Sequence, residues 1–79
     1  MINMNDDEKI ERIKLFLKEN TYTYILDIYK YNFNGFIKKF DNNTIIFLDD
    51  EIGEIPIMIK EIKFIGYSKK AKRGGNGNK

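Results

Sequence analysis

The sequence predicts a mainly β protein with one N-terminal α-helix, folded as a small, strongly bent, five-stranded barrel. Near the N-terminus, apolar residues recur at helical spacing, whereas from Thr21 onward the period changes to two and β-forming residues dominate. The β-rich part divides into short runs separated by tight turns. A helix followed by five short strands is the plan of a small barrel with a single hydrophobic core.

The first element is expected to be a helix over residues 6–19, preceded by a flexible segment at residues 1–5. Asn5 is a suitable N-cap, and Glu8 completes a capping box with it. Asn20 tolerates the left-handed conformation in which helices often end. The apolar stripe that faces the core consists of Ile10, Ile13, Phe16 and Leu17. The basic residues expected on the outer surface of the helix are Lys9, Arg12, Lys14 and Lys18.

Five strands are expected to follow, at about residues 23–31, 33–40, 44–48, 55–60 and 62–67. Gly35 lies inside the second strand, where a glycine indicates a sharp bend or a close approach of two backbones. Asn42 and Asn43 follow Asp41 in a turn, because Asn and Asp tolerate left-handed geometry. Pro56 places the fourth strand at a sheet edge or near a strand start. The residues that separate the fourth strand from the fifth are Lys60 and Glu61.

Residues 6–68 are expected to form one domain, because 79 residues suffice for a single small core. Residues 69–79 contain no apolar pattern and are expected to be a disordered, basic, Gly-rich tail. The acidic run at residues 49–54 does not follow the spacing of a calcium loop and is expected to be a solvated turn. A core of this size is marginal by itself, so we expect self-association or a ligand to add stability.

The composition excludes several classes of protein. The chain has no Cys and no His, so neither a disulfide nor an ordinary zinc site can form, and no cofactor is expected. Ser68 is the only serine and has no base to activate it, so we expect no enzyme activity. The acidic N-terminus lacks a signal-peptide pattern and no apolar run is long enough to span a membrane, so we expect a cytoplasmic protein. The net charge of +2 is too small to imply a nucleic-acid partner by itself.

Several short motifs resemble those of the Hfq and Sm-like family of RNA-binding proteins. Residues 18–22 are similar to the helix-to-strand junction of Hfq, the bacterial Sm-like RNA chaperone. Residues 35–42 resemble the first Sm motif, which has a strand glycine, an apolar residue two positions later and an apolar-Asp pair at the turn. Residues 45–48 match its apolar third strand, and the similarity covers roughly residues 8–67. SH3-like and oligonucleotide-binding barrels remain alternatives on strand count, while the N-terminal helix and the short join between the last two strands favour the Sm-like version of the SH3-like barrel.

The resemblance implies an RNA-binding ring protein, an RNA chaperone or post-transcriptional regulator of the Hfq type that binds single-stranded A/U-rich RNA. The homo-oligomeric ring would have about six or seven subunits, with the fourth strand of one subunit paired with the fifth strand of the next. An apolar sheet edge agrees with this arrangement, because such an edge needs a second chain to cover it. The apolar residues in question are Ile55, Ile57, Met58, Ile59, Ile62, Phe64 and Ile65. Two alternatives remain: a Sm-fold ring that is a protein-interaction scaffold without RNA binding, and a monomeric SH3-like accessory domain.

On one face of such a ring, the resemblance assigns uridine contacts to Asn42, Asn43 and Lys60. Asn43 stands where the family usually has a stacking aromatic, and stacking contributes roughly 1–3 kcal/mol per base. The residues assigned to A-rich RNA on the opposite face are Tyr29, Lys30 and Tyr31, and those assigned to the rim are Lys14 and Lys18. The tail residues expected to neutralise phosphates are Lys69, Lys70, Lys72 and Arg73. The tyrosines and asparagines also have an ordinary structural interpretation, because Tyr favours strands and Asn favours turns.

Overall fold

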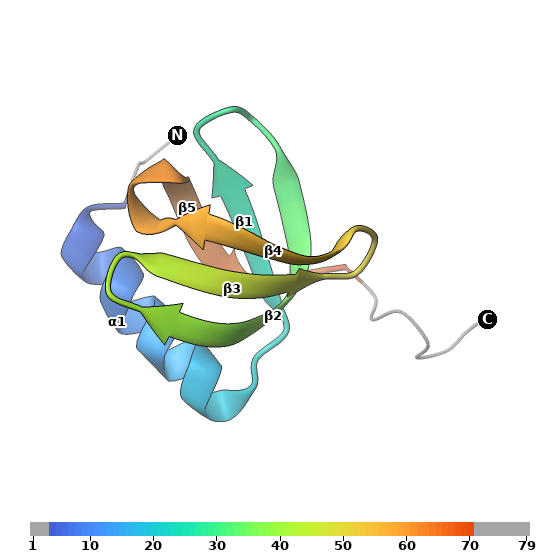
Figure 1. Cartoon of the computed structure of the whole chain (residues 1–79), viewed down its shortest axis with the longest axis horizontal. Coiled ribbons are helices and arrows are strands. Elements are labelled where there is room, and N and C mark those ends of the chain that lie inside the picture. The colour runs from blue at the N-terminus through green and yellow to red at the C-terminus, as the bar shows by residue number, and fades with distance from the viewer. Residues whose placement is uncertain (1–3, 71–79) are drawn as a thin grey trace.

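The computed structural model describes residues 4–70 and contains one helix and one antiparallel sheet (Figure 1). The elements in chain order are α1 (Asp6–Glu19), β1 (Thr23–Asp27), β2 (Asn32–Asp41), β3 (Thr44–Asp49), β4 (Gly53–Met58), the 3₁₀ turn η1 (Ile59–Glu61) and β5 (Ile62–Tyr67). The five strands form one sheet in the order β4-β3-β2-β1-β5, and each neighbouring pair is antiparallel. A mainly β fold with one N-terminal helix is therefore confirmed.

The expected closure of the strands into a barrel is wrong. Strands β4 and β5 each have one neighbour in the sheet, so the sheet is curled but open, with these two strands at its edges (Figure 1). The reason lies in η1, which carries the chain away from β4 so that β5 pairs with β1 at the far edge. Helix α1 packs against β2, β5 and η1, and it covers one side of the curled sheet (Figure 1).

The helix has the bounds and caps that the sequence predicts. The Asn5 side chain accepts a hydrogen bond of 2.8 Å from the main-chain N–H of Glu8, whose carboxylate accepts one of 3.1 Å from the N–H of Asn5. Asn20 ends the helix in the left-handed conformation, at φ 53°. The preceding Met4, expected in a flexible segment, donates its N–H to the carbonyl of Lys63 at 3.3 Å. The placement of Lys9 on the outer surface is wrong, because its side chain is buried against η1.

Strand β1 is shorter than predicted and ends at Asp27 instead of continuing to Tyr31. The cause is local: one carboxylate oxygen of Asp27 accepts hydrogen bonds of 2.9 Å from the N–H groups of both Tyr29 and Tyr31. Lys30 between them has a positive φ of 73°, so the chain turns at this point. The Asp27 carboxylate thus competes for N–H groups that a longer strand would use, and the strand ends although β-forming residues follow.

Strand β4 is displaced relative to the prediction, because it begins at Gly53 and ends at Met58. The Asp49 carboxylate accepts hydrogen bonds from the N–H groups of Glu51 at 2.9 Å and Ile52 at 3.1 Å, which closes a tight turn before Gly53. Asp49 is itself buried, so the acidic run is not wholly solvated. Strands β2 and β3 differ from prediction by about a residue at their ends, and β5 agrees with it.

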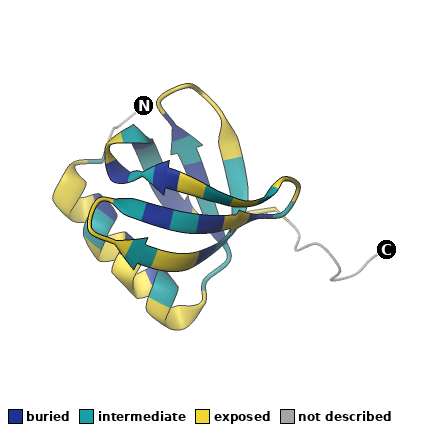
Figure 2. Ribbon diagram, in the orientation of Figure 1, coloured by how far each residue is buried: buried dark blue, intermediate teal, exposed yellow. Residues whose placement is uncertain are grey.

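The core lies inside the curled sheet and under the helix (Figure 2). Its buried apolar residues are Ile13, Phe16, Ile25, Ile37, Ile45, Phe47, Ile57, Ile59, Ile62 and Ile65. Four of the residues expected on an exposed apolar edge, namely Ile57, Ile59, Ile62 and Ile65, therefore belong to the core of the chain itself. Only Ile55, Met58 and Phe64 of that set are half-buried.

Gly35 confirms the close backbone approach that the sequence predicts. A Cβ atom built on Gly35 would lie 1.8 Å from the carbonyl oxygen of Leu48 on β3. No other amino acid fits this position without moving one of the two strands. The glycine thus allows β2 and β3 to bend together toward the core.

Candidate nucleic-acid interface

Three residues that the resemblance assigns to uridine, Asn42, Asn43 and Lys60, line one pocket of about 270 Å³. We call it the η1 pocket, and its other lining residues are Asp6, Ile10, Met58 and Ile59. Asn42 takes a positive φ of 63° in the turn between β2 and β3. The carbonyl of Asn43 accepts a 2.8 Å hydrogen bond from the N–H of Ile59, which places η1 beside this turn. The fold therefore joins two parts of the chain that are distant in sequence.

Lys9 supports this pocket from the helix. Its ammonium donates a hydrogen bond of 3.3 Å to the carbonyl of Ile59 and lies 3.5 Å from a carboxylate oxygen of Asp6. Lys9 is only 6% exposed, whereas its sequence pattern predicts a place on the outer surface of the helix. A signal was present, because Lys9, Ile13 and Phe16 are spaced to lie on one face of a helix.

The described residues of the η1 pocket offer hydrogen-bonding groups and no aromatic ring. Its amide, ammonium and carboxylate groups come from Asn42, Asn43, Lys60 and Asp6, all of which are exposed. Asn43 also accepts a 3.1 Å hydrogen bond from the hydroxyl of Thr44, which orients its side chain. Groups of this kind recognise the edges of a base, whereas stacking on its faces needs an aromatic or guanidinium plane.

The residues assigned to A-rich RNA lie on the turn between β1 and β2, at the top of Figure 1. Tyr29 is 60% exposed and Tyr31 65% exposed, and the Tyr29 hydroxyl donates a long hydrogen bond of 3.4 Å to the carboxylate of Glu61. The N–H of Ile28 donates to the carbonyl of Glu61 at 2.9 Å. The two predicted RNA sites are thus connected through η1. Its first residue, Ile59, bonds to the β2–β3 turn, and its last, Glu61, bonds to the β1–β2 turn.

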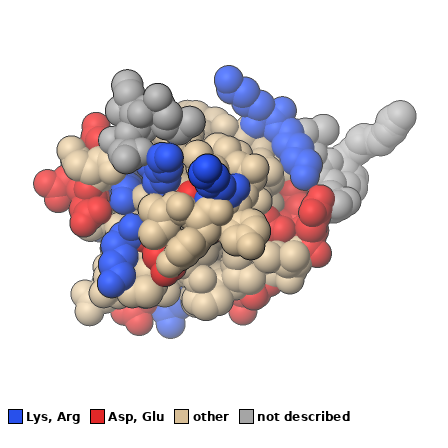
Figure 3. Space-filling model, turned by 90° about the horizontal axis from the view of Figure 1, so that it is seen from above, with Lys and Arg blue, Asp and Glu red and all other residues tan. Residues whose placement is uncertain are grey.

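A second pocket next to η1 extends the basic surface. It has a volume of about 360 Å³ and is lined by Met4, Lys9, Ile28, Lys60, Ile62 and Lys63. Lys60 lines this pocket and the η1 pocket, so its ammonium can serve either. In the view of Figure 3, basic side chains project from largely uncharged surface, while acidic side chains lie mainly around the periphery. This surface therefore favours binding of a negatively charged chain, although the net charge of the protein is small.

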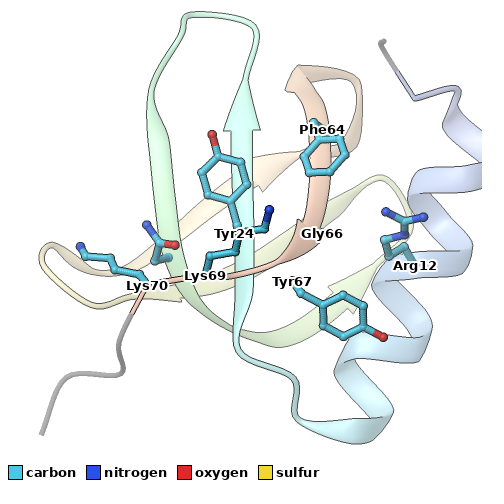
Figure 4. A pocket seen from close by; sticks show the side chains of 8 residues that line it. Arg12, Tyr24, Phe64, Gly66, Tyr67, Lys69 and Lys70 are labelled. Carbon is cyan, nitrogen blue, oxygen red and sulfur yellow. The ribbon is translucent and has the colours of Figure 1, made fainter. Parts of the chain in front are cut away.

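The remaining predicted residues are dispersed. Lys14 and Lys18 are exposed on α1 and line neither pocket beside η1. Lys69 and Lys70, expected in a disordered tail, follow β5 after Ser68 and line a further pocket with Arg12 (Figure 4). Lys72 and Arg73 lie outside the described residues.

Within residues 4–70, no group of three or more acidic side chains is placed to hold a metal ion. The described part of the chain also contains no helix that is long and apolar enough to cross a membrane. Comparison with known proteins finds no matching family model and no significant match to a curated protein.

Proposed function

We propose that this protein is an RNA-binding subunit of the Sm-like type, which assembles into a ring and binds single-stranded A/U-rich RNA. The observation that carries the proposal is the η1 pocket, in which Asn42, Asn43 and Lys60 come together. These residues belong to two separate turns, and the resemblance assigns the same base to both. The exposed aromatic residues on the β1–β2 turn supply a second candidate contact.

The strand order supports assembly through the sheet edges. Strands β4 and β5 are the edges of the open sheet, which is what pairing of β4 with β5 of a second subunit requires. The β5 edge already makes three contacts. The N–H of Met4 donates to the carbonyl of Lys63 at 3.3 Å, Arg12 donates to the carbonyl of Ile65 at 2.9 Å, and the N–H of Ile65 donates to the sulfur of Met4 at 3.4 Å. Strand pairing would exchange these contacts for main-chain hydrogen bonds, and ring closure would leave no free edge.

The η1 pocket lacks an aromatic, so each copy is expected to bind a base weakly. Stacking contributes roughly 1–3 kcal/mol per base, and only hydrogen bonds and phosphate contacts remain in its place. In a ring, several copies of the pocket would act on one RNA strand, so the overall affinity would exceed that of a single pocket. We therefore expect binding that depends strongly on assembly and on salt.

Native mass spectrometry of the full chain tests the proposal, at low and moderate salt, with and without short oligo-A and oligo-U. A ring that takes up one oligonucleotide supports it, and a ring that takes up none leaves the scaffold alternative. A monomer under all conditions contradicts the assembly. Asn42→Ala combined with Lys60→Gln should weaken oligo-U binding, while Lys39→Gln, an exposed lysine on β2 that lines neither pocket beside η1, should not.

A further inference from the structure

A pocket of about 540 Å³ lies on the outer face of the sheet beside the β5 edge (Figure 4). We call it the edge pocket, and its lining residues are Arg12, Tyr24, Asn34, Phe64, Gly66, Tyr67, Lys69 and Lys70. Arg12 also contacts the β5 edge, and none of these residues lines either pocket beside η1. Its size is in the range of pockets that hold small ligands.

The walls of the edge pocket are aromatic because of the alternation along two paired strands. Ile25 and Ile65 point into the core, so Tyr24 and Phe64, each next in sequence, stand on the outer face. Their ring centroids are 6.2 Å apart and the ring planes are inclined by 50°. Gly66 pairs with Tyr24 across the strands, and a Cβ on it would lie 2.9 Å from the Phe64 ring. The missing side chain therefore leaves room for the Phe64 ring to lie against Gly66.

Positive charge stands at opposite ends of this aromatic surface. In Figure 4, Arg12 lies on the helix side of Gly66, whereas Lys69 and Lys70 lie on the other side. The Arg12 guanidinium is held by its 2.9 Å hydrogen bond to the carbonyl of Ile65, which uses only one of its N–H groups. Among residues 4–70, no acidic residue lines the pocket, although Lys70 reaches Glu51 beyond it at 3.6 Å.

The lysine end is fixed by Ser68. The hydroxyl of Ser68 donates a 2.6 Å hydrogen bond to the side chain of Asn34, and its N–H donates to the carbonyl of Tyr22 at 3.1 Å. The N–H of Lys70 in turn donates to the Ser68 hydroxyl at 3.2 Å. The first basic residues after β5 are therefore held at the rim of the pocket by the fold.

We propose that the edge pocket binds one internal nucleotide of a single-stranded RNA. The base lies against Tyr24 and Phe64, and the two phosphates that flank it contact Arg12 at one end and Lys69 at the other. Aromatic faces accept any base, and cations at both ends match a nucleotide that carries a phosphate on each side. The proposal rests on RNA as the ligand of this protein, but it concerns a site separate from the η1 pocket.

The edge pocket and the proposed strand pairing meet at the carbonyl of Ile65, because pairing would take that carbonyl and release the Arg12 guanidinium for a phosphate. Pairing extends a sheet in its own plane through main-chain groups, whereas Tyr24 and Phe64 project from the outer face. A ring would therefore present one edge pocket per subunit beside each junction. RNA could then contact a subunit at η1 and again near its boundary with the next.

The test compares a nucleoside 3′,5′-bisphosphate with the 5′-monophosphate by calorimetry on the full-length protein. We expect the bisphosphate to bind about tenfold more tightly, because it can engage both cationic ends. Arg12→Gln and Lys69→Gln, which alter exposed residues, should each abolish most of that preference. Phe64→Leu should weaken both ligands by about 5- to 150-fold, the range that loss of base stacking implies. Lys39→Gln is the matched control and should change neither affinity.

Equal affinity for the two ligands, or a preference that survives Arg12→Gln and Lys69→Gln, would overturn the edge-pocket proposal. Parallel titrations with oligo-A and oligo-U separate the two proposals. If RNA binds and is unaffected by Phe64→Leu and Arg12→Gln, the edge pocket is not an RNA site and the η1 proposal stands. If the bisphosphate binds but no oligonucleotide does, the RNA proposal fails, and with it the assignment of this pocket to an internal RNA nucleotide.

Discussion

The ammonium of Lys9 donates a hydrogen bond of 3.3 Å to the main-chain carbonyl of Ile59 and so ties the first part of α1 to η1. The N–H of Ile59 bonds to Asn43, and the carbonyl of Glu61 accepts from Ile28. Three segments that are far apart in sequence therefore hold the short turn that carries Lys60. The shape of the candidate RNA site depends on these contacts.

Replacing Lys9 by Met keeps an unbranched side chain and removes its hydrogen bond. The buried carbonyl of Ile59 keeps its hydrogen bond from the N–H of Ile62 but loses the one from Lys9, so we expect the free energy of unfolding to fall by about 1 kcal/mol. Urea denaturation measures this loss, and hydrogen exchange at the N–H of Ile59 should become faster. Lys14→Met, on the exposed face of the same helix, should change stability by less than about 0.5 kcal/mol. Equal effects of the two substitutions would contradict the role of Lys9.

Asp49 and Asp27 both accept main-chain hydrogen bonds, but they use their oxygens differently. Asp49 accepts from Asn34 on one oxygen and from Glu51 and Ile52 on the other, at 2.9–3.1 Å. Asp49→Asn places an NH₂ group against at least one of these donors, so we expect a loss of about 1–3 kcal/mol.

Asp27 accepts both of its hydrogen bonds on a single oxygen. Asp27→Asn can keep that oxygen as an amide carbonyl, and we expect it to cost less than about 1 kcal/mol, mainly from the lost charge. Urea midpoints of the two variants provide the comparison. A loss at Asp27 as large as that at Asp49 would show that charge, and not the number of oxygens used, governs these turns.

Gly35 and Gly53 form a second matched pair. Gly35→Ala puts a Cβ 1.8 Å from the Leu48 carbonyl oxygen, and we expect a loss of at least about 3 kcal/mol, a large part of the stability of a domain this small. Gly53→Ala meets no atom within 4 Å and costs only the strain of its positive φ of 87°, about 1–2 kcal/mol. Thermal unfolding followed by circular dichroism distinguishes them. Similar melting temperatures would mean that β2 and β3 can separate locally without cost.

Asn43→Phe should strengthen oligo-U binding, because it adds an aromatic face to the η1 pocket. Stacking contributes roughly 1–3 kcal/mol per base, so we expect the added ring to raise the affinity about 5- to 150-fold. Asn43→Leu adds apolar surface without a π face and serves as the control. Fluorescence anisotropy with labelled oligo-U measures both. No gain with Phe, or the same gain with Leu, would exclude base stacking at this position.

The local signals in the sequence were the most reliable ones. The capping box at Asn5 and Glu8, the left-handed Asn20 and the close approach at Gly35 are all present in the structure. Each depends on the preferences of one residue or on partners within a few positions, so it can be predicted without the rest of the fold. The early end of β1 was also a local event, which the Asp27 side chain could have indicated.

The sequence by itself thus determined one helix, five strands and the turns between them. Only the tertiary structure decided that the sheet stays open, that Lys9 is buried and that Asn42, Asn43 and Lys60 share a pocket. It alone also brought Arg12, Tyr24 and Phe64 to the edge pocket from a helix and two different strands. The physical reason is that periodicity fixes which way a side chain points along its own element, while strand order and curvature fix which distant side chains meet.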